Sequence, residues 1–184
     1  MNRWIVQASP QQFLIDWYMD EYVRSNPNDT DWWLVERRYQ DAVAPRDVIY
    51  VWKAKSEPPR QRAREYFAWL ESIGRIGQVA GIFAVGRIET SPKPWPPPSL
   101  NDERFRKYEI GHPWDKLPPA VNWVACIYTD NRARNPLLQE TIWERLGQST
   151  QTDFGGFKKF RTRRLVKLEP WEADLIDSLL RNSK

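Results

Sequence analysis

The sequence Val43-Ala44-Pro45-Arg46-Asp47-Val48-Ile49-Tyr50-Val51-Trp52 leads from a turn into a clear strand, which we expect over residues 48–54. Proline and aspartate before the run are typical of a turn, and the run itself is rich in β-branched and aromatic residues. A second run of the same kind covers residues 80–89. The two strands can pair as a hairpin if the segment between them, residues 55–79, is an insertion.

The inserted segment contains its own helix. Residues 58–73 are typical of a basic amphipathic helix, with Arg60, Arg62 and Arg64 followed by aromatic residues at helical spacing. Because the flanking strands already form a complete pair, we expect this helical insertion, at about residues 55–79, to be dispensable. A short turn in its place should leave the domain folded.

Three further strands and three further helices complete the expected fold. The strands are at residues 3–8, 121–129 and 163–168, and the helices at residues 9–24, at 137–146 and from 170 onward. Ser9 is the expected N-cap of the first helix, before Pro10. Five strands interrupted by short helices, without regular alternation of the two, predict an α+β fold. We expect a small mixed β-barrel with peripheral helices, formed by residues 1–184 as a single domain.

Composition narrows the function classes. The 184 residues include eleven tryptophans and carry a formal net charge of +4, which permits a polyanionic partner. Cys126 and His112 are the single cysteine and the single histidine, so an internal disulfide is impossible and a zinc site would depend mostly on carboxylates. No apolar run of about 18 residues and no secretory segment is present. We therefore expect a cytoplasmic protein without a membrane span, a metal or a cofactor.

Three stretches of the sequence form an ordered set. They are Asp31-Trp32-Trp33-Leu34-Val35-Glu36-Arg37, the run from residue 43 to 52, and Gly81-Ile82-Phe83-Ala84-Val85-Gly86-Arg87-Ile88. This series resembles the EVE domain, a member of the PUA-like group that also includes YTH, ASCH and SRA-type readers. The resemblance covers most of the chain except about residues 55–79. Two positions depart from the family pattern: its glycine before Asp47 is Arg46 here, and its K-S-E-P after the first strand is Gln7-Ala8-Ser9-Pro10.

The resemblance implies a PUA-like barrel of about five to six strands that accepts a flipped or single-stranded base, in particular a methylated one. An aromatic pocket favours such a base, because stacking contributes about 1–3 kcal/mol and burial of the methyl about 1 kcal/mol. By match to the motif, Trp33 and Trp52 are the expected walls of this base-binding pocket. Trp32 can exchange roles with Trp33, and Ser9 is expected at the rim. The alternatives are that the tryptophans fill the core and that Ser9 only caps a helix.

A basic segment is the expected contact to the nucleic-acid backbone. Residues 154–167 contain no acidic residue, and phenylalanines are interleaved with the cations Lys158, Lys159, Arg161, Arg163 and Arg164. Cations alternating with aromatic rings suit a surface that follows phosphates and stacks bases. A solvated edge strand protected by its cations is the alternative. The arginines of residues 58–73 are a weaker second candidate.

These features favour a non-catalytic module that binds DNA or RNA through a modified or unpaired base, with any effector or nuclease on a separate chain. The first alternative is an enzyme, an ASCH-like RNase or a small amidohydrolase, for which Lys53, Arg37 and Asp47 are the candidate catalytic residues. The second alternative is a protein-interaction module built on the proline-rich residues 92–98 and the helix at 58–73. Of the three, the non-catalytic binding module is the function that we expect.

Overall fold

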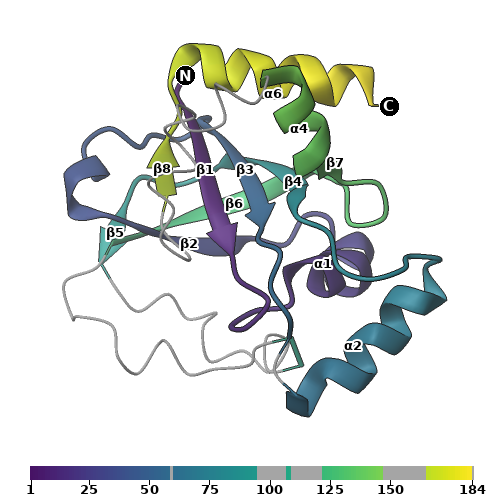
Figure 1. Ribbon diagram of the computed structural model, residues 1–184. Helices are drawn as coiled ribbons and strands as arrows, with labels where there is room; N and C mark the ends of the chain where they lie inside the picture. Colours follow the sequence, from purple (N-terminus) through teal and green to yellow (C-terminus); the bar gives the residue numbers. More distant parts are fainter. Residues whose placement is uncertain (59, 95–106, 109–121, 147–164, 184) are drawn as a thin grey trace.

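The computed structural model describes residues 1–58, 60–94, 107–108, 122–146 and 165–183. Its centre is a β-sheet rolled into a nearly closed barrel (Figure 1). In hydrogen-bonded order, the barrel strands are β2 (Asp31–Val35), β6 (Asn122–Asn131), β4 (Gly81–Ile88), β3 (Val48–Lys53), β1 (Arg3–Ala8) and β8 (Leu165–Lys167). β2 and β8, the two ends of this order, contact each other. The expected α+β barrel is confirmed.

The strand directions make the sheet mixed. β1 is parallel to β3, whereas the other neighbouring pairs of the barrel are antiparallel. β3 and β4 pair directly along their length, from Val48 opposite Arg87 to Lys53 opposite Gly81, so they form the expected hairpin around the intervening helix. Two short strands extend the sheet: β5 (Lys93–Pro94) pairs with β6, and β7 (Leu137–Leu138) pairs with β4.

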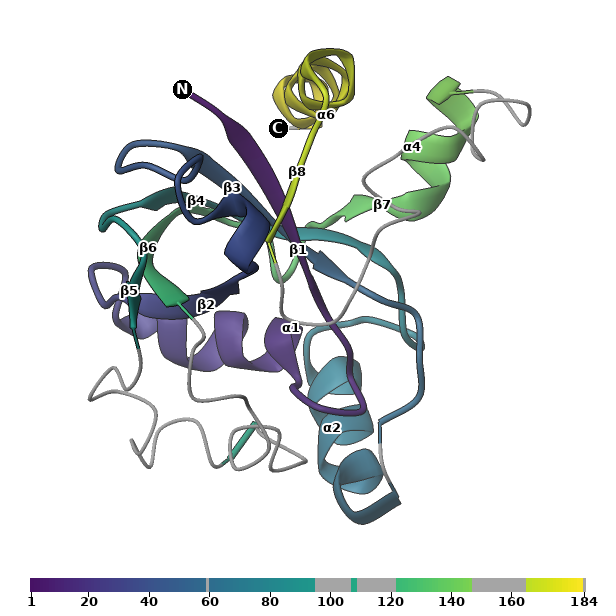
Figure 2. The same cartoon turned by 90° about the vertical axis from the view of Figure 1, so that its left-hand side faces the viewer.

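Alternation along the strands produces two apolar clusters, one on each face of the sheet. On β3, Ile49 and Val51 belong to the cluster inside the barrel, while Tyr50 and Trp52 belong to the outer cluster. The helices α4 (Gln139–Leu146) and α6 (Pro170–Asn182) cover the outer cluster, and α1 (Ile15–Tyr18) with the π-helix η1 (Met19–Val23) packs on the inner one. Figure 2 shows α6 and α1 on opposite sides of the barrel.

The first helix begins later than expected. It begins at Ile15 and continues as η1. The backbone carbonyl of Ser9 accepts hydrogen bonds from the N–H groups of Gln12 and Phe13, each at 2.9 Å. Residues 9–13 therefore form a turn ahead of the helix, and the predicted N-cap role of Ser9 is wrong.

The other helices agree with the sequence more closely. α2 (Arg60–Ser72), α4 and α6 lie within the ranges expected for them, although β7 replaces the first residues of the helix expected at 137–146. β2 is a strand that the sequence does not predict, because its five residues follow a polar turn and show no alternation of polar and apolar side chains. In the described parts of the chain, no helix combines the length and apolar character needed to cross a membrane.

A buried group of charges fixes α2 to the barrel. Lys53, at the end of β3, and Asp16, in α1, are fully buried, with Lys53 Nζ 3.2 Å from Asp16 Oδ2. The same oxygen accepts a 2.6 Å hydrogen bond from the hydroxyl of Tyr66 in α2 and lies 3.6 Å from Nη1 of Arg75. Burial lowers the pKa of Lys53, and the charge of Asp16 opposes this effect. Because an unpaired buried charge is strongly destabilising, these groups depend on one another.

The apolar face of α2 is continuous with the barrel interior. Tyr66, Trp69 and Leu70 are buried in the same cluster as the inward-facing strand residues. Trp69 stacks on Trp17 of α1 with ring centroids 6.1 Å apart. This packing argues against the expectation that the segment is dispensable. The flanking strands pair without it, but its removal would expose both the aromatic cluster and the charges of Asp16 and Lys53.

Replacement of residues 57–78 by a short glycine-containing turn should therefore abolish cooperative unfolding. Each buried aromatic or leucine side chain that is lost costs about 2–5 kcal/mol, and the loss of three approaches the whole stability of an ordinary domain. Denaturant unfolding followed by tryptophan fluorescence measures this. Phe67→Ala, on the half-exposed face of α2, is the control and should cost less than about 1 kcal/mol. A shortened chain with a single sharp transition would contradict the assignment of α2 to the core.

The turn before β3 stores backbone strain at one residue. Arg46 has a φ of 76°, the one positive φ among the non-glycine residues described. Its backbone N–H donates to the carbonyl of Ile88 at 2.7 Å, which holds this conformation. The left-handed region costs an ordinary residue about 1–2 kcal/mol, whereas glycine adopts it freely. The backbone conformation at Arg46 therefore favours glycine, the residue that the EVE pattern has at this position.

Arg46→Gly should raise the free energy of unfolding by about 0.5–1 kcal/mol, because the strain relieved exceeds the extra chain entropy of glycine. Chemical denaturation of both proteins gives the difference. Arg37→Gly, at an exposed position in the 3-10 helix η2 (Arg37–Tyr39), is the control and should be destabilising. A loss of stability in both variants would show that Arg46 carries no strain.

Candidate nucleic-acid interface

The two predicted pocket walls lie on opposite faces of the sheet. Trp33, in β2, belongs to the inner cluster and is 5% exposed, whereas Trp52, in β3, belongs to the outer cluster and is 3% exposed. Trp52 lies close to Trp143 of α4, with ring centroids 6.4 Å apart. The structure therefore does not bring Trp33 and Trp52 together around one base.

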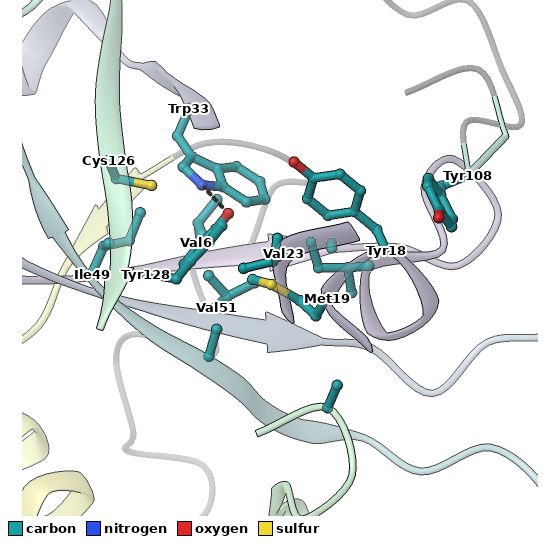
Figure 3. Packing of buried hydrophobic residues seen from close by; sticks show 14 of the residues in the cluster. Val6, Tyr18, Met19, Val23, Trp33, Ile49, Val51, Tyr108, Cys126 and Tyr128 are labelled. Carbon is teal, nitrogen blue, oxygen red and sulfur yellow. Dashed lines mark hydrogen bonds between the residues drawn. The ribbon is translucent and has the colours of Figure 1, made fainter. Parts of the chain in front are cut away.

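A chain of hydrogen bonds holds Trp33 inside the barrel (Figure 3). Its indole N–H donates to the hydroxyl of Tyr128 at 3.1 Å, and this hydroxyl donates to Asp31 Oδ2 at 2.6 Å. Burial and the charge of Asp31 raise the pKa of Tyr128 well above its ordinary value, so the hydroxyl stays protonated. The chain fixes the plane of the indole ring and engages its only polar group.

An aromatic series continues from Trp33 toward the surface. Tyr18, from α1, is buried in the same inner cluster as Trp33, and Figure 3 draws both side chains. Tyr18 stacks on Tyr22 with centroids 5.4 Å apart and an interplanar angle of 10°, and Tyr22 is half-buried. Stacked rings that reach the surface are a suitable platform for a base. The sequence places Tyr18 and Tyr22 only on the buried face of a helix, because the spacing of four residues is also that of a core-facing stripe.

The remaining predicted residues do not converge on this series. Trp32 is half-buried and alternates with Trp33 along β2, so its side chain leaves the opposite face of the strand. Ser9 is half-buried in the turn that follows β1. The basic residues of the predicted backbone contact lie outside the described residues; they are Lys158, Lys159, Arg161, Arg163 and Arg164.

The three residues considered for catalysis do not form one site. Asp47 immediately precedes β3 and Lys53 is its last residue, so the two lie about 20 Å apart at the rise of a strand. Lys53 is fully buried in its ion pair, and Asp47 accepts the backbone N–H of Ala44 at 3.1 Å in the turn before β3. Arg37 is exposed. This separation argues against a reaction shared by the three side chains.

A shallow groove of about 190 Å³ lies between α6 and the sheet. It is lined by Val85, Asp130, Arg132, Asp177, Leu180 and Arg181. Its buried arginine, Arg132, is satisfied within the fold, because it donates to Asp130 at 2.7 Å and to the carbonyl of Leu180 at 3.0 Å. Within the described ranges, no group of three or more histidine, cysteine or acidic side chains is placed to hold a metal ion.

Solved structures share the fold of this chain over nearly its whole length. Human THYN1 protein, in complex with DNA containing 5-methylcytosine, matches with a TM-score of 0.56 and 12% identity over 97% of each chain. The DUF55 domain of human thymocyte nuclear protein 1 matches with a TM-score of 0.53 and 12% identity over 96% of this chain and 97% of its own. A hypothetical protein from Leishmania major has a TM-score of 0.54 and 10% identity, over 100% of this chain and 98% of its own.

No protein-family model and no curated protein sequence matches the chain. At these identities the structural similarity establishes the fold. That fold is the PUA-like barrel implied by the resemblance to the EVE domain.

Tyr128→Phe should destabilise the protein by about 1–3 kcal/mol, because it removes the hydroxyl that accepts the Trp33 N–H and donates to the buried carboxylate of Asp31. The free energy of unfolding in denaturant measures the loss. Tyr39→Phe is the control, because the Tyr39 hydroxyl takes part in no hydrogen bond among the described residues. Equal effects of the two substitutions would show that the hydrogen-bond chain does not hold Trp33.

Proposed function

We propose that this chain is a non-catalytic module that binds nucleic acid and recognises a modified or unpaired base. The observation that carries the proposal is the fold shared, over 97% of both chains, with the THYN1 protein in complex with DNA containing 5-methylcytosine. The formal net charge of +4 is consistent with a polyanionic ligand. The separation of Lys53 from Asp47 favours binding over the enzymatic alternative.

The proposed base site is the aromatic series Trp33, Tyr18 and Tyr22. Tyr22 is half-buried and so reaches the surface, while Trp33 is buried and oriented by its hydrogen bond to Tyr128. Stacking on such rings contributes about 1–3 kcal/mol per base, and an added methyl group about 1 kcal/mol when buried. Ser9 stays a predicted hydrogen-bond donor at the rim. Trp32 lies on the opposite face of β2 and is a separate candidate, whereas Trp52 lies in the outer cluster, away from the proposed site.

Cations outside this series are proposed to hold the phosphate backbone. On α2, Arg60 and Arg64 are exposed and lie one helical turn apart, and Phe67 is 43% exposed. They complement the predicted contact at residues 158–164. Phosphate contacts position a nucleic acid and do not specify its sequence, so discrimination depends on the base site. The proposed module performs no reaction, and an effector or nuclease would be a separate chain in the cytoplasm.

Fluorescence anisotropy with DNA and RNA oligonucleotides that differ only in methylation tests the function. Trp33→Leu should weaken binding of the preferred modified oligonucleotide by about 1–3 kcal/mol and affect the unmodified one less. Trp52→Leu is the matched control, because it removes an equally buried indole from the outer cluster. Both variants should lose folding stability, but only Trp33→Leu should lower the ratio of modified to unmodified affinity.

Tyr22→Ala should change the folding stability less than Trp33→Leu, because the side chain of Tyr22 is only half-buried. It should lower the same affinity ratio with little change in the unfolding midpoint. A protein that binds no oligonucleotide at low salt would contradict the proposed function. A protein that binds but keeps its ratio in Trp33→Leu and Tyr22→Ala would move the base site elsewhere.

A further inference from the structure

Two arginines from distant parts of the chain converge on one buried carboxylate. The side chain of Asp20, in η1, is 4% exposed, and its Oδ1 accepts from Arg24 Nη2 at 2.6 Å and from Arg134 Nε at 2.8 Å. Its Oδ2 accepts from Trp69 Nε1 at 3.2 Å and from Arg134 Nη2 at 3.3 Å. These donors occupy the lone pairs that a carboxylate offers. Asp20 therefore holds both guanidinium groups close together.

Both guanidinium groups keep most of their donors for another acceptor. A guanidinium has five N–H donors, and Arg24 directs one nitrogen to Asp20 while Arg134 directs two. The side chains of Arg24 and Arg134 are 43% and 56% exposed. Among the described residues, neither arginine has another hydrogen bond or ion pair. The remaining donors are thus available to a ligand from solvent.

Asp20 neutralises only one of the two arginines. Burial alone would raise the pKa of Asp20, but the hydrogen bonds from Arg134 and Trp69 and the charge of Arg24 lower it overall, so the carboxylate stays ionised. The neighbouring Glu21 does not compensate the second arginine, because it is bound to Lys107. A positive charge in excess remains at the surface. An anion shared by the two guanidinium groups reduces their repulsion.

We propose that Arg24 and Arg134 form a binding site for a phosphate group. The planar guanidinium fork matches two phosphate oxygens at once, and a fixed pair of forks is oriented before the ligand arrives. The site takes a phosphate of the bound nucleic-acid backbone, and this identification of its ligand rests on the proposed function. Recognition of the phosphate itself rests only on the geometry at Asp20.

Inorganic phosphate tests the site without nucleic acid. In 15N NMR spectra at constant ionic strength, phosphate should shift the Nε–H signals of Arg24 and Arg134. Arg87 is the matched control, because its side chain is 54% exposed and is bound to a single carboxylate, that of Glu89, at 2.7 Å. Its signal should stay nearly unchanged. Equal shifts at all three arginines, or none at Arg24 and Arg134, would overturn the site.

Oligonucleotide binding tests the identity of the ligand. Arg24→Gln combined with Arg134→Gln should lower the slope of log affinity against log salt by about one, since the two arginines share one phosphate and each phosphate contact contributes about one. Arg87→Gln should leave the slope unchanged. Because the double variant leaves Asp20 buried with only Trp69, a triple variant that adds Asp20→Asn avoids an unpaired charge and should show the same reduced slope.

The two experiments separate this inference from the proposed function. Oligonucleotide binding with an unchanged slope in the double and triple variants would overturn the backbone contact and leave the function standing. Phosphate shifts at Arg24 and Arg134 in a protein that binds no oligonucleotide would overturn the function and retain a phosphate site for a free anion.

Discussion

The ion pair between Asp16 and Lys53 is the contact on which the arrangement of the helices depends. Both side chains are fully buried, at a depth where an isolated charge would cost several kcal/mol. Their common partner is Tyr66, whose hydroxyl ties α2 to α1. One helical turn later, Asp20 repeats the contact by accepting the indole N–H of Trp69. Asp16 and Asp20, one turn apart in α1 and η1, thus accept hydrogen bonds from Tyr66 and Trp69, one turn apart in α2. These two hydrogen bonds fix α2 against α1 and η1.

Local sequence signals predict the strands and most helices but not the partners of α2. The runs at residues 48–53 and 81–88 are β-branched and aromatic, and the structure pairs them as expected. The same local view treats the intervening helix as detachable, because the chain enters and leaves it beside a finished hairpin. No local sequence pattern predicts that Lys53, at the end of a strand, and Asp16, in a helix, are buried. Their pairing is set by tertiary packing, which a periodicity does not encode.

The site is harder to predict than the fold for a related reason. In β3, inward-facing Val51 and outward-facing Trp52 are both buried, so polarity does not reveal which residue points into the barrel. In β2, Trp32 and Trp33 have the same side chain and differ only in face. A motif can therefore identify Trp33 and Trp52 as tryptophans of interest without showing that they lie in different clusters. The face of each strand follows from register, and register requires knowledge of its neighbours.

The π-helix links the proposed base site with the proposed phosphate site. Met19 and Val23 pack in the cluster that contains Trp33, while Asp20, between them in sequence, faces the arginines. The backbone N–H of Arg24 reaches back five residues to the carbonyl of Met19, which widens this turn and shifts the phase of its side chains. Residues of η1 therefore belong to both proposed sites, because Tyr22 is part of the aromatic series and Asp20 orients the two arginines. The fold thus places the proposed base site and the proposed phosphate site on one short element.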